Sequence, residues 1–145
     1  MTQVLYTAEA HVSGGRLEGH GRTSDGALDV EIRPPDPNAA EPAGTNPEQL
    51  FAVGYAACFE SAMRTVARRK KIEVGDAYVD SKVMLLPTEE RGFKLGVELD
   101  ATLPGIEDAE EAVRLVATAH KVCPYSNATR GNIDVKLTAN GEPVD

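Results

Sequence analysis

Alternating apolar and polar positions predict a strand-rich N-terminal part. Residues 3–12 place apolar side chains on one face, and we expect a strand there. Residues 16–23 predict a second strand, which Gly19 and Gly21 weaken. Alternation of Leu28, Val30 and Ile32 predicts a third. The turn sequences "SGG" and "SDG" separate these segments, so three consecutive antiparallel strands are expected.

A long loop and a sharply defined helix follow. Residues 34–45, "PPDPNAAEPAGT", are rich in proline and alanine and predict a loop. Asn46 is suited to cap a helix, and Pro47 suits its first turn. We expect this helix to continue to about Arg68. Its interior is apolar almost all round, which indicates burial on more than one side and room for a partner subunit.

The remaining patterns complete an α+β arrangement. Residues 72–86 and 92–103 predict two strands, and Asp108 is suited to cap a second helix that Pro124 should end. Residues 132–138 predict a last strand. The order βββ-α-ββ-α-β favours antiparallel sheets packed on two main helices, in a single domain covering residues 1–145.

Composition and charge exclude several functions. The chain has 145 residues and a net charge of −8, with no basic patch that would suit nucleic acid. No apolar run approaches the length of a membrane span, so we expect no membrane association. No export signal is visible either. We therefore expect a cytoplasmic protein, in which a permanent disulfide is disfavoured.

The two cysteines are the candidate chemistry. Cys58 lies in the middle of the first helix, and Cys123 lies at the end of the second, in "HKVCPYSNATRG". Both can be small buried hydrophobes. Alternatively, one is a reactive thiol and the other its resolving partner. A reactive thiol must be ionised, and lowering its pKa from 8.5 to about 6 requires roughly 3.4 kcal/mol, which a nearby cation would supply.

A metal site is a further alternative. His120 stands three residues before Cys123, a spacing that some zinc sites use. Only two cysteines and three histidines are present, and the other histidines lie in a different segment. The composition therefore favours a residue on the helix surface over a ligand, and no metal or bound cofactor is expected.

Two segments resemble the organic hydroperoxide resistance (Ohr) proteins of the OsmC/Ohr superfamily. They are "GTNPEQLFAVGYAACFESAM" at 44–63 and "AHKVCPYSNATRGNIDV" at 119–135. The likeness extends to "GGR", "SDGALDV" and "GFKLGVEL" and covers essentially the whole chain. It implies an OsmC-like fold, an intertwined homodimer with sites at the subunit interface, and a cysteine peroxidase acting on organic hydroperoxides, lipid-derived ones included.

The resemblance also implies roles for four residues. Cys58 matches the peroxidatic cysteine, which becomes a sulfenic acid, and Cys123 matches the resolving cysteine, which forms a disulfide with it. Arg16 matches the arginine that stabilises the thiolate, and Glu48 the carboxylate that orients Arg16. The implied reductant is dihydrolipoamide or a lipoylated protein. Without the resemblance, we would interpret Arg16 as a solvated residue and Glu48 as a carboxylate that the helix dipole favours.

Helix geometry adds a hypothesis about the dimer. Glu48 and Cys58 are ten residues apart, about 15 Å along a continuous helix. An Arg16–Glu48 pair would therefore serve the Cys58 of the partner chain, unless the helix breaks near Gly54.

The sequence is also compatible with two other functions. One is an OsmC-type peroxidase with a broader oxidant range, and the other is a non-enzymatic redox-sensing or binding module on the same fold.

Overall fold

The computed structural model describes residues 2–145 and divides them into two compact units. The N-terminal unit extends to Leu50 and the C-terminal unit runs from Phe51 to Asp145. The interpretation of residues 1–145 as a single domain stays a prediction.

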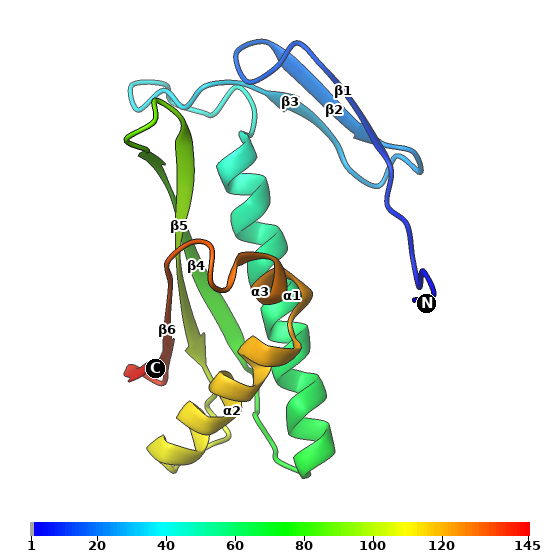
Figure 1. Ribbon diagram of the computed structural model, residues 1–145. Coiled ribbons are helices and arrows are strands. Elements are labelled where there is room, and N and C mark those ends of the chain that lie inside the picture. Colours follow the sequence, from blue (N-terminus) through cyan, green and yellow to red (C-terminus); the bar gives the residue numbers. More distant parts are fainter. Residues whose placement is uncertain (1) are drawn as a thin grey trace. The chain divides into compact units, whose positions relative to one another are not determined.

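The N-terminal unit contains a three-stranded antiparallel sheet in the order β1-β2-β3 (Figure 1). Its strands are β1 (Ala10–Ser13), β2 (Gly19–Thr23) and β3 (Asp29–Ile32). The strand expected over residues 3–12 was wrong for residues 3–9, which lie outside any strand. The reason is that β2 is short. Its last residue, Thr23, pairs with Ala10, and the chain turns after Thr23, so β2 offers no residues that could pair with residues 3–9. Without a partner strand, alternation alone cannot make a ladder.

The loop over residues 34–45 is confirmed, and backbone hydrogen bonds close it at its base. Thr45 N–H donates to the Glu31 carbonyl at 2.8 Å, and Arg33 N–H donates to the Thr45 carbonyl at 2.9 Å. The last residue of the loop is thereby held beside the end of β3, directly before the first helix.

Helix α1 spans Pro47–Lys70, as its capping signals predicted. The side chain of Asn46 accepts a hydrogen bond from the Gln49 backbone N–H at 2.8 Å, which satisfies one of the free donors of the first turn. Three basic residues stand in the last turn, where the helix dipole favours them. The helix runs through Gly54 without interruption.

The C-terminal unit is built on a four-stranded sheet in the order β4-β5-β6-β7. Its strands are β4 (Tyr78–Pro87), β5 (Phe93–Thr102), β6 (Val135–Ala139) and β7 (Glu142–Val144). β4 begins at Tyr78, so the expected strand start at residue 72 was wrong. The α+β class is confirmed with one exception to the antiparallel pattern: β5 and β6 are parallel. A helical crossover connects them, as parallel strands require.

That crossover consists of α2 (Ala109–Val122) and α3 (Pro124–Thr129). Asp108 caps α2 by accepting a hydrogen bond from Glu110 N–H at 3.0 Å. Pro124 ends α2 as expected, but it also begins α3, which the sequence analysis missed. Proline is well suited to the first position of a helix because the amide proton it lacks would be unpaired there.

A single cluster of buried side chains joins α1, α2 and the larger sheet. Tyr55, Phe59 and Met63 of α1 are fully buried in it, and so is Cys123. The Ser81 hydroxyl of β4 donates to the Ala52 carbonyl of α1 at 2.9 Å, which also joins helix and sheet. On α2, the side chains of Ala112, Val116 and Ala119 are each fully buried in the same cluster.

Candidate active site

The two cysteines lie next to each other in the C-terminal unit. Cys58 is half-buried on α1, and Cys123 is fully buried at the joint between α2 and α3. Both thiols are free. They are close enough for Cys123 to perturb the ionisation of Cys58 through a hydrogen bond and through charge.

Burial raises the pKa of the Cys58 thiol above its ordinary value, because the thiolate loses solvation. The Tyr125 backbone N–H donates to the sulfur and lowers the pKa, whereas Cys123 raises it further. None of these groups is a cation. Within the described residues, the surroundings of Cys58 therefore favour the neutral thiol, and activation requires a positive charge.

Three aromatic rings pack together near Cys58: Phe51 and Tyr55 lie on α1, and Tyr125 lies on α3. The ring centroid of Tyr125 lies 5.7 Å from that of Phe51 and 5.6 Å from that of Tyr55. Gly54 makes room for this packing, since a Cβ atom there would lie 2.7 Å from the Tyr125 hydroxyl oxygen. The glycine that looked like a possible helix break thus serves the close approach of α3 to α1.

Arg16 and Glu48 form a two-point ion pair within the N-terminal unit. Arg16 Nη1 donates to Glu48 Oε1 at 2.8 Å, and Nη2 donates to Oε2 at 3.1 Å. The hydrogen bond from Arg16 lowers the pKa of Glu48, and the same contact raises the pKa of Arg16. The pairing that the sequence resemblance implied is present, with Arg16 following the Gly14–Gly15 turn and Glu48 in the first turn of α1.

His120 takes part in a buried hydrogen-bond network that the sequence analysis did not anticipate. Its Nδ1 lies 2.8 Å from the Ser126 hydroxyl oxygen, which in turn lies 2.8 Å from the hydroxyl of Tyr55. Burial lowers the pKa of His120, and Arg130 lowers it further. Within residues 2–145, no group of three or more His, Cys, Asp or Glu residues is arranged to hold a metal ion.

Glu60 lies two residues after Cys58 on α1. It forms an i, i+4 ion pair with Arg64, so its carboxylate is paired with a neighbour on the same helix. We assign it no part in the site.

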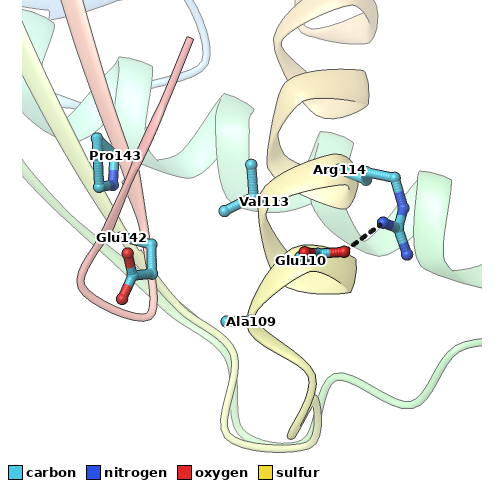
Figure 2. A pocket seen from close by; sticks show the side chains of 6 residues that line it. All are labelled: Ala109, Glu110, Val113, Arg114, Glu142 and Pro143. Atoms are coloured by element: carbon cyan, nitrogen blue, oxygen red, sulfur yellow. Dashed lines mark ion pairs between the residues drawn. The ribbon is translucent and has the colours of Figure 1, made fainter.

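A separate pocket of about 360 Å³ lies between α2 and β7 (Figure 2). Its lining includes Val113 and Pro143, together with Glu110 and Arg114, which pair at 3.8 Å. None of the residues singled out from the sequence lines this pocket. No helix within residues 2–145 is both long and apolar enough to span a membrane.

Comparisons with known proteins establish the family of this chain. A family model described as OsmC-like protein matches residues 36–138. The organic hydroperoxide resistance protein of Xanthomonas axonopodis pv. citri (strain 306) is 51% identical over 140 residues, covering 94% of this chain and 95% of that protein. The organic hydroperoxide resistance protein OhrB of Bacillus subtilis (strain 168) is 48% identical over 134 residues, covering 92% and 96%.

A solved structure shows the same fold. The crystal structure of an organic hydroperoxide resistance protein from Legionella pneumophila superposes with a TM-score of 0.86 at 54% identity, covering 94% of this chain and 98% of that one. The family match covers more than half of the chain, and the three relatives each cover 92–94% of it, so the sequence resemblance is confirmed. The chain belongs to the OsmC-like family and, within it, to the organic hydroperoxide resistance proteins.

Proposed function

We propose that this protein is a thiol-dependent peroxidase that reduces organic hydroperoxides, including lipid-derived ones, to alcohols. The observation that carries the proposal is the placement of its two cysteines, one half-buried and one fully buried, side by side at the meeting point of α1 and α3. The names of its relatives support the same class of substrate.

The proposed catalytic cycle has three steps. The Cys58 thiolate attacks the O–O bond, which breaks; the alcohol leaves after taking a proton, and Cys58 becomes a sulfenic acid. The Cys123 thiol then attacks that sulfur, so an S–S bond forms, the S–O bond breaks and water leaves. A dihydrolipoyl dithiol finally reduces the disulfide by exchange and is itself oxidised to the cyclic disulfide.

Arg16 is proposed to supply the cation that Cys58 lacks among its own neighbours. A guanidinium beside the sulfur would oppose the effect of burial and favour the thiolate. The two-point contact with Glu48 supports this role, because it fixes the plane of the guanidinium and keeps Glu48 ionised.

We further propose that Arg16 acts across a homodimer, on the Cys58 of the partner subunit. The unbroken course of α1 through Gly54 supports this version, since a break there was the condition for a pairing within one chain. An uncovered apolar surface on α1 also supports a partner: Val53 is 71% exposed and Ala57, one turn later, is exposed too.

The proposal assigns no bound cofactor. Electrons come from dihydrolipoamide or from a lipoylated protein, which is a partner in the reducing environment of the cytoplasm. No role for nucleic acid or a membrane is proposed.

A peroxide panel with dihydrolipoamide as electron donor tests the function. We expect turnover of cumene hydroperoxide well above turnover of hydrogen peroxide, no turnover by Cys58→Ser, and a single reaction followed by sulfenic acid accumulation in Cys123→Ser. Equal rates with both peroxides would indicate the broader OsmC-type enzyme. No turnover of any peroxide would indicate a sensing or binding module.

A further inference from the structure

A cluster of buried hydroxyl groups joins the three helices of the C-terminal unit. The Tyr55 hydroxyl oxygen of α1 lies 2.8 Å from Ser126 Oγ and 3.0 Å from Thr129 Oγ1, both on α3. Ser126 Oγ also lies 2.8 Å from His120 Nδ1 on α2. Tyr55 and Ser126 have no exposed surface. Each helix therefore contributes at least one member to a single network.

The network is fully satisfied with one donor from each group. His120 Nδ1–H donates to Ser126, Ser126 to Tyr55, Tyr55 to Thr129, and Thr129 to the Ser126 carbonyl. This assignment places the proton of the neutral imidazole on Nδ1, and the lowered pKa of His120 favours that neutral form. A satisfied buried network adds little net stability compared with apolar side chains, but it specifies one arrangement of its helices.

Members of this network lie three residues before or after each of the two cysteines in the sequence. Tyr55 precedes Cys58 by three residues on α1, which makes them neighbours on the helix surface. His120 precedes Cys123 by three residues and Ser126 follows it by three. The residue after Pro124, Tyr125, gives its backbone N–H to the Cys58 sulfur. Any shift of α3 along α1 would therefore move Cys123 and this N–H together, away from Cys58.

We propose that Tyr55, Ser126 and His120 are positioning residues that hold the joint between α2 and α3 against α1, so that Cys123 reaches the sulfenic acid of Cys58. They touch none of the reacting atoms in this role. The inference rests on the proposed peroxidase function and assigns a task to residues that the cycle itself does not use.

The step that depends on position is disulfide formation. The Cys123 sulfur must approach the Cys58 sulfur opposite the departing oxygen, with Cβ atoms about 3.5–4.5 Å apart. Displacements of about 1 Å slow such reactions strongly. While Cys123 is displaced, the sulfenic acid persists, and a second hydroperoxide oxidises it to a sulfinic acid, releasing another alcohol. Peroxide attack on Cys58 precedes this step and needs no movement of Cys123.

Single-turnover kinetics with cumene hydroperoxide separate the formation of the sulfenic acid from the formation of the disulfide. Tyr55→Phe and Ser126→Ala each remove one hydroxyl. We expect disulfide formation to slow by at least about fivefold in each, while sulfenic acid formation changes less, and the sulfinic fraction measured by mass spectrometry to rise. Thr118→Val is the matched control, because its hydroxyl donates to the Arg114 carbonyl on the exposed side of α2.

Two substitutions of His120 give a test that a merely structural role would not pass. The amide nitrogen of Asn occupies the place of Nδ1, whereas that of Gln occupies the place of Nε2. We expect the His120→Asn variant to form the disulfide at nearly the wild-type rate. The His120→Gln variant should form it slowly and accumulate more sulfinic acid. Thermal unfolding of all variants is measured in parallel.

Equal slowing of both steps in proportion to lost stability, or no slowing of either, would overturn the positioning role alone. Absence of any sulfenic acid in the wild-type protein would overturn the proposed peroxidase function and this inference with it.

Discussion

Arg16 and Glu48 face each other through two parallel hydrogen bonds, of 2.8 and 3.1 Å, between guanidinium and carboxylate. The Arg16 side chain is about half exposed, while that of Glu48 is 19% exposed. Because both terminal nitrogens are engaged, the guanidinium has one orientation, and its remaining N–H groups can face another anion. The proposed thiolate of Cys58 is that anion.

The first prediction concerns the ionisation of Glu48. Its folded pKa is lowered below the ordinary 4.5, chiefly by the hydrogen bond from Arg16. The stability it contributes is therefore present above pH 4.5 and is lost as the pH falls through the folded pKa. NMR titration should show the Glu48 pKa rising in Arg16→Met and staying unchanged in Arg22→Met. An unchanged Glu48 titration in Arg16→Met would contradict the pairing.

The second prediction concerns Cys58 itself. Burial raises the pKa of its thiol above the ordinary value in the surroundings that its own unit provides, and the proposed arginine must reverse this. In a Cys123→Ser background, thiolate absorbance should give a Cys58 pKa below that of a free thiol. The additional change Arg16→Met should move it above that value, whereas Arg22→Met should not. A high pKa in the presence of Arg16 would rule out thiolate stabilisation by that residue.

The third prediction tests whether the site forms across chains. A mixed dimer is prepared from one Arg16→Ala chain and one Cys58→Ser chain. If the site forms across chains, the intact Cys58 of one chain lies beside the intact Arg16 of the other, and about half of the wild-type activity per dimer remains. If the site forms within one chain, neither site is complete, and the activity per dimer falls to about half that of the Arg16→Ala homodimer, which has two Cys58 thiols instead of one. Turnover of purified, differently tagged heterodimers distinguishes the two results.

The fourth prediction concerns the contact of Gly54 with Tyr125. A Cβ atom at position 54 would lie 2.7 Å from the Tyr125 hydroxyl oxygen and 3.3 Å from two of its ring carbons. Gly54→Ala gains about 1 kcal/mol of helix propensity, but displacing a packed ring costs typically 1–3 kcal/mol. We expect a net loss of roughly 1 kcal/mol in urea denaturation.

Tyr125→Phe provides the control for that substitution. It removes the nearest clashing atom while keeping the ring, so Gly54→Ala should cost less in this background. Equal costs in both backgrounds would mean that the hydroxyl is not the obstacle.

Local signals in the sequence determined much of this protein. Each of these signals acts within a few residues. The caps at Asn46 and Asp108 act through hydrogen bonds to the first turn of their helices, and the alternation of Leu28, Val30 and Ile32 follows the period of a strand. The sequence also carries the family resemblance, in the segments around the two cysteines, and that resemblance implies the pairing of Arg16 with Glu48.

Tertiary structure alone decided what depends on contacts distant along the chain. Residues 3–9 alternate like a strand but have no ladder, because β2 is too short to pair with them. The parallel pairing of β5 with β6 follows from the crossover through α2 and α3. Tyr55, Ser126 and His120 carry no signal of their own, since Tyr55 lies more than 60 residues before the other two and only packing brings them together. Hydrogen bonds within one helix are set by spacing, whereas those between helices exist only once the core has closed.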